Sequence, residues 1–202
     1  MTSNDGQGAP RRRLWNLRGN DRQDSPATLP AGTEPSARSG QPPAPAGTAP
    51  SAAGTLRIGA PVTGELIALS QVGDPAFSAG LLGPGMGVRP SSGEVTAPVG
   101  GALVSVMPHA YGLRTPQGLE VLVHVGIDTV SLKGRHFDPL VEQGQQIEPG
   151  QALVRVDVPA IVEAGLDPTV IVVVTNADSV GGIETQVPGP VESGQAVATV
   201  TL

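Results

Sequence analysis

Short runs of β-branched and aliphatic residues, each bounded by glycine or proline, constrain this chain more than any other feature. The runs are Gly101–Val106, Glu120–Val125, Ala152–Val156, Thr169–Val174 and Ala196–Leu202. Valine, isoleucine and threonine favour extended strands, and glycine and proline between them mark turns. Closely spaced strands of this kind predict an all-β sandwich or barrel. We expect only one helical turn, near Pro159–Gly165.

Two short sequences occur twice in the chain. Ile147–Leu153 (IEPGQAL) returns as Val191–Val197 (VESGQAV), and Pro61–Leu66 (PVTGEL) returns as Pro98–Leu103 (PVGGAL). Each copy places a glycine turn before an apolar strand, and such repetition is typical of a duplicated structural unit. We therefore predict an antiparallel β-sandwich with internally duplicated halves, of the barrel-sandwich hybrid type.

The beginning of the chain differs in composition from the rest. Residues 25–54 are dominated by proline, alanine, serine, threonine and glycine. Such a sequence buries too little apolar surface to offset the conformational entropy lost on folding. We predict that residues 1–55 form a disordered tail and that residues 56–202 form one folded domain, which is long enough for its own core.

Composition excludes several classes of function. The chain has no cysteine, so disulfides, thiolate zinc sites and thiol nucleophiles are absent. The net charge is −6 and Lys133 is the single lysine, which argues against a nucleic-acid partner because phosphate binding needs clustered basic residues. The longest strictly apolar run, Val170–Val174, is far shorter than the roughly 20 residues that span a bilayer. We expect a cytoplasmic protein.

Two of the three histidines would be brought together by a hairpin. The segment Thr115–Gly118 has proline and glycine at the second and fourth positions, as in a type I turn. If its two middle residues form the loop, His109 pairs directly with His124. Directly paired residues have Cβ atoms about 4.5–5.5 Å apart. Tyr111 and Leu122 would then lie next along the same face.

A carboxylate, Asp128, follows His124 by four residues, and Gly126 between them permits a bulge or a close backbone approach. A nearby carboxylate can fix an imidazole tautomer and favour its charged form. Asp128 serves equally well as a turn residue that caps its own backbone. A histidine pair beside a carboxylate supports either zinc binding or nucleophilic phosphoryl transfer, and composition does not choose between them.

The sequence around the histidines resembles the glucose-type (glucose/N-acetylglucosamine) enzyme IIA domain of the bacterial phosphoenolpyruvate-dependent sugar phosphotransferase system. The resembling segments are Gly118–Val130, Leu132–Gly134 with Phe137, Ala97–Gly101, His109-Ala110 and Val170–Asn176. The resemblance extends from Pro61 to the C-terminus. It implies an antiparallel β-sandwich with a shallow active-site depression, acting as a phosphotransferase component without a cofactor.

The resemblance also implies which residues form the site. His124 corresponds to the phosphorylated histidine, and His109 corresponds to the supporting histidine, which is needed chiefly for onward transfer. Asp128 corresponds to an acidic position that lies near the partner's basic surface. The residues implied for an apolar rim are Phe77, Val125 and Val130. No metal is required, although His109 and His124 offer an adventitious zinc site.

The implied partners are HPr as phosphoryl donor and a cysteine of an enzyme IIB domain as acceptor, which brings the protein transiently to the membrane through a sugar permease. Phosphorylation that mainly regulates protein targets is the alternative. One departure from the family concerns the supporting histidine. The family commonly has threonine two residues before it, and this chain has Met107 followed by Pro108. A hydroxyl that would support His109 is therefore missing.

Two other classes with related folds fit the sequence less well. Zinc metallopeptidases share the H-x-x-x-D spacing of His124 and Asp128, but they also need a later H-x-H pair, and the only other histidine here is His136. Lipoyl and biotinyl carriers have turns like Glu148–Gln151, but they need a modifiable lysine at a hairpin tip. The setting of Lys133 does not match that requirement.

Overall fold

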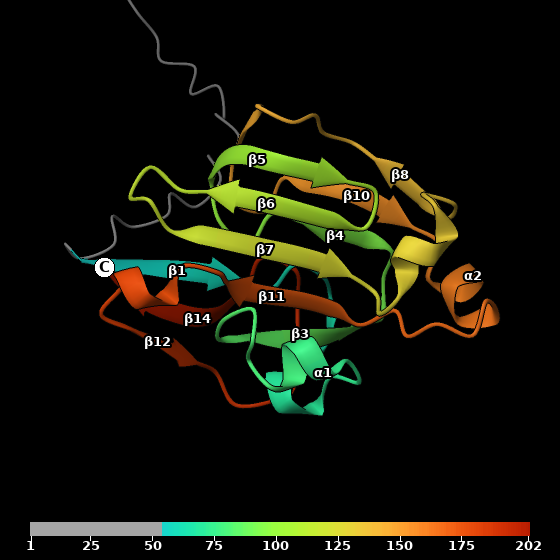
Figure 1. Ribbon diagram of the computed structural model, residues 1–202, viewed down its shortest axis with the longest axis horizontal. Coiled ribbons are helices and arrows are strands. Elements are labelled where there is room, and N and C mark those ends of the chain that lie inside the picture. The colour runs from blue at the N-terminus through green and yellow to red at the C-terminus, as the bar shows by residue number, and fades with distance from the viewer. Residues whose placement is uncertain (1–53) are drawn as a thin grey trace, which may run out of the picture. The chain divides into compact units, whose positions relative to one another are not determined.

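The computed structural model describes residues 54–202, which consist mainly of antiparallel strands (Figure 1). Apart from Gly54 and Thr55, the predicted tail of residues 1–55 lies outside the described residues. Thr55 belongs to the first strand, β1 (Thr55–Gly59), and stands one residue before the predicted start of the folded domain. None of the helices in residues 54–202 has the length and apolar character needed to cross a bilayer.

The largest sheet in this part of the chain has eight strands in the order β13-β2-β3-β11-β7-β6-β5-β9. In chain order its strands are β2 (Gly64–Ala68), β3 (Gly85–Pro90), β5 (Gly101–Met107), β6 (Ala110–Arg114), β7 (Glu120–Val125), β9 (Gln146–Ile147), β11 (Val170–Val174) and β13 (Gly189–Val191). All neighbouring pairs are antiparallel. Its central strands β7 and β11 lie within two of the apolar runs predicted from the sequence.

Two three-stranded sheets complete the described architecture, with the orders β1-β14-β12 and β4-β10-β8. Besides β1, the strands of these two sheets are β4 (Glu94–Thr96), β8 (Phe137–Pro139), β10 (Ala152–Val156), β12 (Gly182–Thr185) and β14 (Ala196–Thr201). The helices of residues 54–202 are α1 (Pro75–Ser78), α2 (Val158–Glu163), η1 (Leu69–Gln71), η2 (Thr129–Leu132) and η3 (Ala177–Ser179). Helix α2 matches the predicted helical turn, whereas α1 was not predicted.

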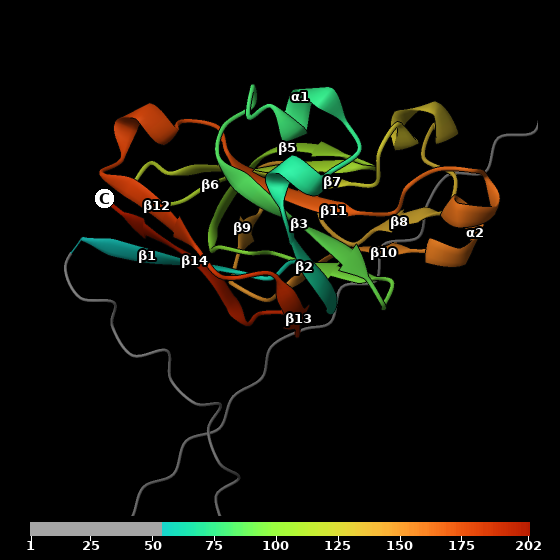
Figure 2. The same ribbon diagram turned by 90° about the horizontal axis from the view of Figure 1, so that it is seen from below.

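The main core lies between one face of the large sheet and the two smaller sheets. Strand β7 shows how the sequence sorts its side chains, because successive residues point to opposite faces. Val121, Val123 and Val125 face the main core, which also contains Ile58 of β1 and Val154 of β10. The other face of the large sheet carries a smaller apolar cluster, to which α1 contributes. Figure 2 shows α1 on that side of β3 and β11.

The repeated sequences occupy equivalent places, which confirms the predicted internal duplication. Ala60 exchanges two backbone hydrogen bonds, 2.7 and 2.9 Å long, with the turn Gly194-Gln195. Ala97 exchanges the same two bonds, both 2.8 Å long, with the turn Gly150-Gln151. Each copy of one repeated sequence thus begins beside a copy of the other. Together with the antiparallel sheets, this arrangement confirms the predicted β-sandwich.

The hairpin loop between β6 and β7 is one residue longer than predicted. The N–H of Gly118 donates to the carbonyl of Thr115, and the N–H of Thr115 donates to the carbonyl of Leu119, each at 2.9 Å. Three residues therefore form the loop, and the last of them, Gly118, has φ of 87°. A type I turn followed by a left-handed glycine suits the twist of the flanking strands better than an unprimed two-residue loop does.

The longer loop changes the register of the hairpin. His124 pairs with Ala110, so the predicted direct pairing of His124 with His109 is wrong. A shift of one residue also moves side chains to the opposite face of a sheet. Tyr111 therefore lies in the main core, whereas Leu122 packs against the smaller cluster, and the prediction that the two share a face is wrong as well.

Candidate active site

The two histidines are neighbours despite the changed register. His124 is half-buried near the end of β7, and His109 is half-buried in the turn that joins β5 to β6. Their ring centroids are 5.3 Å apart, and the rings meet edge to face at 75°. His109 directly precedes the start of β6, and its carbonyl accepts a 2.8 Å hydrogen bond from the N–H of Val125. This bond ties the backbone of His109 to the residue after His124.

Helix α1 supplies a third ring to the site. Phe77 is only 6% exposed, and its ring centroid lies 5.2 Å from that of His124. The helix begins where Asp74 Oδ1 accepts hydrogen bonds from the N–H groups of Ala76 (2.7 Å) and Phe77 (3.1 Å). Proline at the first helical position, Pro75, favours this start. The sequence Asp74–Ser78 therefore encodes a single turn that presses Phe77 against His124.

Several groups act on the protonation of His124. Burial of the ring lowers the pKa of His124 most, and the charge of His109 lowers it further. The backbone of Gly126, the carboxylate of Asp74 and then that of Asp128 raise the pKa in part. Burial also lowers the pKa of His109. Both imidazoles are therefore mainly neutral at neutral pH, because the pKa of an unperturbed histidine is about 6.5.

The two ring nitrogens of His124 differ in access. Among residues 54–202, its Nδ1 is the one buried side-chain nitrogen or oxygen that lacks a hydrogen-bond partner. The Gly126 backbone is close enough to favour protonation of the ring, but it does not complete a hydrogen bond of good geometry with Nδ1. Because Nδ1 is buried, Nε2 is the candidate nitrogen for a reactant.

The turn after His124 approaches its neighbours closely at Gly126, as the sequence predicted. Gly126 has φ of 76°, and a Cβ atom there would overlap the side chain of Thr129 and lie 3.0 Å from the carbonyl oxygen of Asp167. The Gly126 N–H donates to the carbonyl of Thr169 at 3.0 Å. Thr129 Oγ1 donates to the carbonyl of Val125 at 2.6 Å. These contacts fix the backbone beside the reactive ring, and only glycine fits.

Asp128 is exposed and has left-handed backbone angles, with φ of 58° and ψ of 13°. In the described structure its side chain makes no capping hydrogen bond, so the turn-capping interpretation is wrong. Its backbone carbonyl instead accepts hydrogen bonds from the Ser131 N–H (3.1 Å) and Oγ (2.7 Å). The exposed carboxylate acts on His124 through its charge.

Comparison with known proteins shows the family of the chain. Residues 56–180 match the family model of the phosphoenolpyruvate-dependent sugar phosphotransferase system, EIIA 1. The chain belongs to this family. It is 39% identical to the glucose-specific EIIA component of Staphylococcus epidermidis, over 63% of this chain and 78% of that protein. Its fold is similar to that of glucose permease IIA from Mycoplasma capricolum, with a TM-score of 0.64 and 34% identity over 72% of this chain and 95% of that one.

Relatives of this EIIA domain also include much longer proteins. It is 42% identical to the glucose-specific EIICBA component of Streptococcus pneumoniae, over 69% of this chain but 19% of that protein. The chain spans 19–27% of the first such relatives. It spans 78–80% of the separate EIIA components. The predicted identity as a glucose-type EIIA domain, and hence as a phosphotransferase component, is confirmed.

The three residues predicted for an apolar rim differ in exposure. Val130 is 62% exposed, and Phe77 covers the ring of His124. Val125 is 1% exposed and faces the main core, so its prediction as a rim residue is wrong. Strand alternation is the reason, because consecutive residues of β7 cannot share a face. Leu81 and Leu82, which follow α1, are exposed apolar residues that the sequence analysis did not single out.

Metal binding finds little support in the described part of this EIIA domain. Residues 54–202 contain no group of three or more histidine, aspartate or glutamate side chains arranged to hold a metal ion. His109 and His124 offer two nitrogens, and zinc sites in proteins use three or four protein ligands. Zinc bound there would need ligands from a partner. The histidine pair thus fits a metal site poorly.

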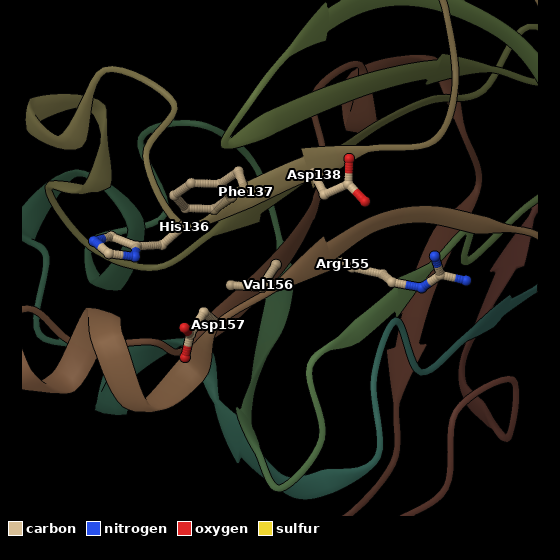
Figure 3. Close-up of a pocket in the computed structure, with 6 residues that line it drawn as sticks. All are labelled: His136, Phe137, Asp138, Arg155, Val156 and Asp157. Atoms are coloured by element: carbon tan, nitrogen blue, oxygen red, sulfur yellow. The ribbon is translucent and has the colours of Figure 1, made fainter.

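The remaining histidine lies in a different place. His136 is exposed and lines a shallow depression of about 380 Å³ at β8 and β10 (Figure 3). Phe137, Asp138, Arg155, Val156 and Asp157 complete its lining. His136 and Arg155 lie toward opposite ends of this depression. Neither His109 nor His124 lines this depression.

Asp74 is the residue of the site that sequence reasoning missed. It caps α1, and its charge raises the pKa of His124 more than that of Asp128 does. A sequence signal for the cap exists, because Asp followed by Pro is a common start of a helix. The four-residue length of α1 leaves no helical periodicity from which to recognise it.

Proposed function

We propose that this EIIA domain carries a phosphoryl group on Nε2 of His124, receiving it from phosphorylated HPr and passing it to a cysteine of an enzyme IIB domain. The observation that carries the proposal is the state of the His124 ring. Its Nδ1 is buried without a partner, its pKa is lowered by burial, and a second imidazole lies at 5.3 Å. Such a ring is neutral, oriented and open at one nitrogen, as a nucleophile must be.

Transfer takes place in two displacements at phosphorus. The Nε2 lone pair of neutral His124 forms a new N–P bond while the bond between phosphorus and HPr breaks, and that electron pair stays on HPr. In the second step a thiolate sulfur of enzyme IIB attacks the same phosphorus. The N–P bond of His124 then breaks, and its electron pair returns to Nε2. A lowered pKa of His124 favours the first step because only the unprotonated nitrogen can attack, and it favours the second because a less basic imidazole leaves phosphorus more readily.

His109 stabilises the charge that these steps place on the phosphoryl oxygens. Its ring meets that of His124 edge to face, so an N–H of His109 can be directed at a phosphoryl group held by Nε2. A donor fixed before reaction stabilises transferring phosphoryl oxygens without further reorganisation. We assign His109 chiefly to onward transfer, where the phosphorylated ring must become a leaving group.

Charge and apolar surface suit docking of a basic carrier. The chain has a net charge of −6, and the carboxylate of Asp128 is exposed beside the site. Attraction between an acidic and a basic surface speeds encounter and weakens with salt. Exposed Val130 and the covering ring of Phe77 supply apolar contacts that would exclude water from the complex. The reaction would take place in the cytoplasm and at the permease, and regulatory targets would read the same phosphorylation state.

Labelling tests the assignment. With phosphoenolpyruvate, enzyme I and HPr, the protein should gain one acid-labile phosphate, and His124→Ala should abolish it. His109→Ala should keep the label but lose transfer to enzyme IIB. Addition of a chelator should change neither step. Labelling that persists in His124→Ala would contradict the proposal, and equal loss of both steps in His109→Ala would show that the two histidines are wrongly assigned.

A further inference from the structure

The backbone on both sides of His109 is held by hydrogen bonds. The peptide after it is fixed because the carbonyl of His109 accepts from the N–H of Val125 at 2.8 Å. The peptide before it is fixed because the carbonyl of Pro108 accepts from the hydroxyl of Tyr111 at 3.1 Å. A peptide unit is planar, so two fixed carbonyls determine the orientation of both planes that meet at the His109 Cα atom. That orientation aims the imidazole.

Tyr111 is suited to hold this turn rigidly. Its residue is 0% exposed and packs in the main core on β6, while its hydroxyl reaches the turn between β5 and β6. Burial raises the pKa of Tyr111, so the phenol keeps its proton and remains a donor at any pH at which the protein would be assayed. A buried tyrosine whose hydroxyl donates a hydrogen bond to a turn carbonyl connects the packed core directly to that turn.

The strand pair holds both ends of the turn, because Met107 pairs with Ala110. Pro108 fixes its own φ but has no N–H with which to make a hydrogen bond. Gly134 lies against the proline ring, since a Cβ atom at Gly134 would be 3.3 Å from Pro108 Cγ. This contact limits movement of the ring but not rotation of the carbonyl. The Tyr111 hydroxyl supplies that remaining constraint.

We propose that Tyr111 is a positioning residue for His109, acting through the carbonyl of Pro108. This inference rests on the proposed role of His109 in onward transfer. Loss of the hydroxyl would loosen the peptide before His109 and leave its ring misdirected for part of the time. His124 would keep its own supports, namely the ring of Phe77 and the hydrogen bonds that fix the turn at Gly126. Acceptance of the phosphoryl group should therefore suffer much less than its donation.

Tyr111→Phe tests this idea, because it removes the hydroxyl and keeps the buried ring. The matched control is Thr115→Val. Thr115 is 3% exposed, lies at the opposite end of the same hairpin, and accepts a 3.1 Å hydrogen bond from the Leu119 N–H on Oγ1. Both variants thus delete one hydroxyl hydrogen bond from the same pair of strands, and both are compared in thermal unfolding. Only Tyr111→Phe touches the turn of His109.

Two readouts are taken on each protein: the rates of acceptance from HPr and of transfer to enzyme IIB, and the imidazole resonances of His109 in NMR spectra. For Tyr111→Phe we expect transfer to enzyme IIB to fall about three- to tenfold, the effect of one net hydrogen bond, while acceptance changes less than twofold. The His109 resonances should shift and broaden. Thr115→Val should leave both rates and these resonances as in the wild type.

Unchanged His109 resonances in Tyr111→Phe would overturn the inference, as would an equal fall in acceptance and transfer. Effects of the same size in Thr115→Val would overturn it too, because they would show a general response to lost stability. The NMR readout needs no phosphoryl transfer. If the wild-type protein transferred nothing, the proposed function would fail while the coupling of Tyr111 to His109 could still be judged.

Discussion

Two substitutions at Asp74 separate a structural effect from an electrostatic one. The Asp74 carboxylate caps α1 through bonds to the N–H groups of Ala76 and Phe77, and its charge raises the pKa of His124. Asp74→Ala removes both the cap and the charge. Asp74→Asn removes the charge but keeps an oxygen that can accept the same hydrogen bonds, because asparagine is as good an N-cap as aspartate.

The two effects have different sizes and readouts. Loss of an N-cap costs about 0.5–2 kcal/mol, so Asp74→Ala should lower the free energy of unfolding by about 1 kcal/mol. For a protein of this size that corresponds to roughly 2–4 °C in the melting temperature. Asp74→Asn should melt like the wild type. Its His124 should have a lower pKa than in the wild type, because a charge that favours the imidazolium is gone.

Calorimetry measures the melting temperatures, and NMR titration of the His124 ring measures its pKa. The reasoning would be refuted if Asp74→Asn left the pKa of His124 unchanged or raised it, since Asp74 would then not act on the ring through charge. It would also be refuted if Asp74→Ala were as stable as Asp74→Asn. In that case the two bonds to Ala76 and Phe77 would not stabilise α1.

Three further predictions concern the backbone and the pH dependence of the site. Gly126→Ala should lower the free energy of unfolding by about 1–3 kcal/mol and abolish phosphoryl acceptance, because a Cβ atom would overlap Thr129. Gly118 is the control, since it has φ of 87° but no atom within 4 Å of an added Cβ. Gly118→Ala should therefore keep acceptance in the same labelling assay. If both variants behaved alike, left-handed strain alone would explain the loss. Asp128→Ala should lower the free energy of unfolding in urea by about 1 kcal/mol, whereas Asp128→Asn should not, since asparagine tolerates the left-handed conformation. Both variants should accept phosphate from HPr more slowly and with a weaker salt dependence. A normal rate in Asp128→Asn would exclude a role for the charge. Burial lowers the pKa of His124 and His109, so below the unfolded pKa of about 6.5 the folded protein binds fewer protons than the unfolded chain. The free energy of unfolding should therefore be highest above about pH 6.5 and fall as the pH drops below that value. Urea unfolding between pH 7.5 and 5 measures how steeply the free energy of unfolding changes with pH. His124→Gln should reduce this dependence, and an equal dependence in that variant would contradict the role given to the buried His124 ring.

Much of the fold follows from sequence because apolar periodicity and turn residues act locally. Strands β7 and β10 occupy the predicted residues, and the repeated sequences make equivalent contacts. The hairpin register did not follow, because one glycine decides between a two-residue and a three-residue loop. The predicted register placed Tyr111 on the face of the histidine pair, whereas it lies in the core, and this error hid the bond from its hydroxyl to the Pro108 carbonyl.

The histidine pair could be predicted from sequence although the register behind it was wrong. His109 lies in a turn beyond the strand end, where its ring approaches that of His124 without direct pairing. The surroundings of the pair could not be predicted in the same way. Asp74 and Phe77 come from a single helical turn far away in sequence, and only the folded chain brings that turn over β11 and β7.

The central claim is that the phosphoryl group resides on Nε2 of His124. It is tested most directly by phosphorylating ¹⁵N-labelled protein with phosphoenolpyruvate, enzyme I and HPr and recording the phosphorus–nitrogen couplings of its imidazoles. The account predicts one phosphorylated ring, His124, with the coupling on Nε2, because Nδ1 is buried. A coupling on Nδ1 of His124, or a phosphorylated His109 or His136, would contradict it.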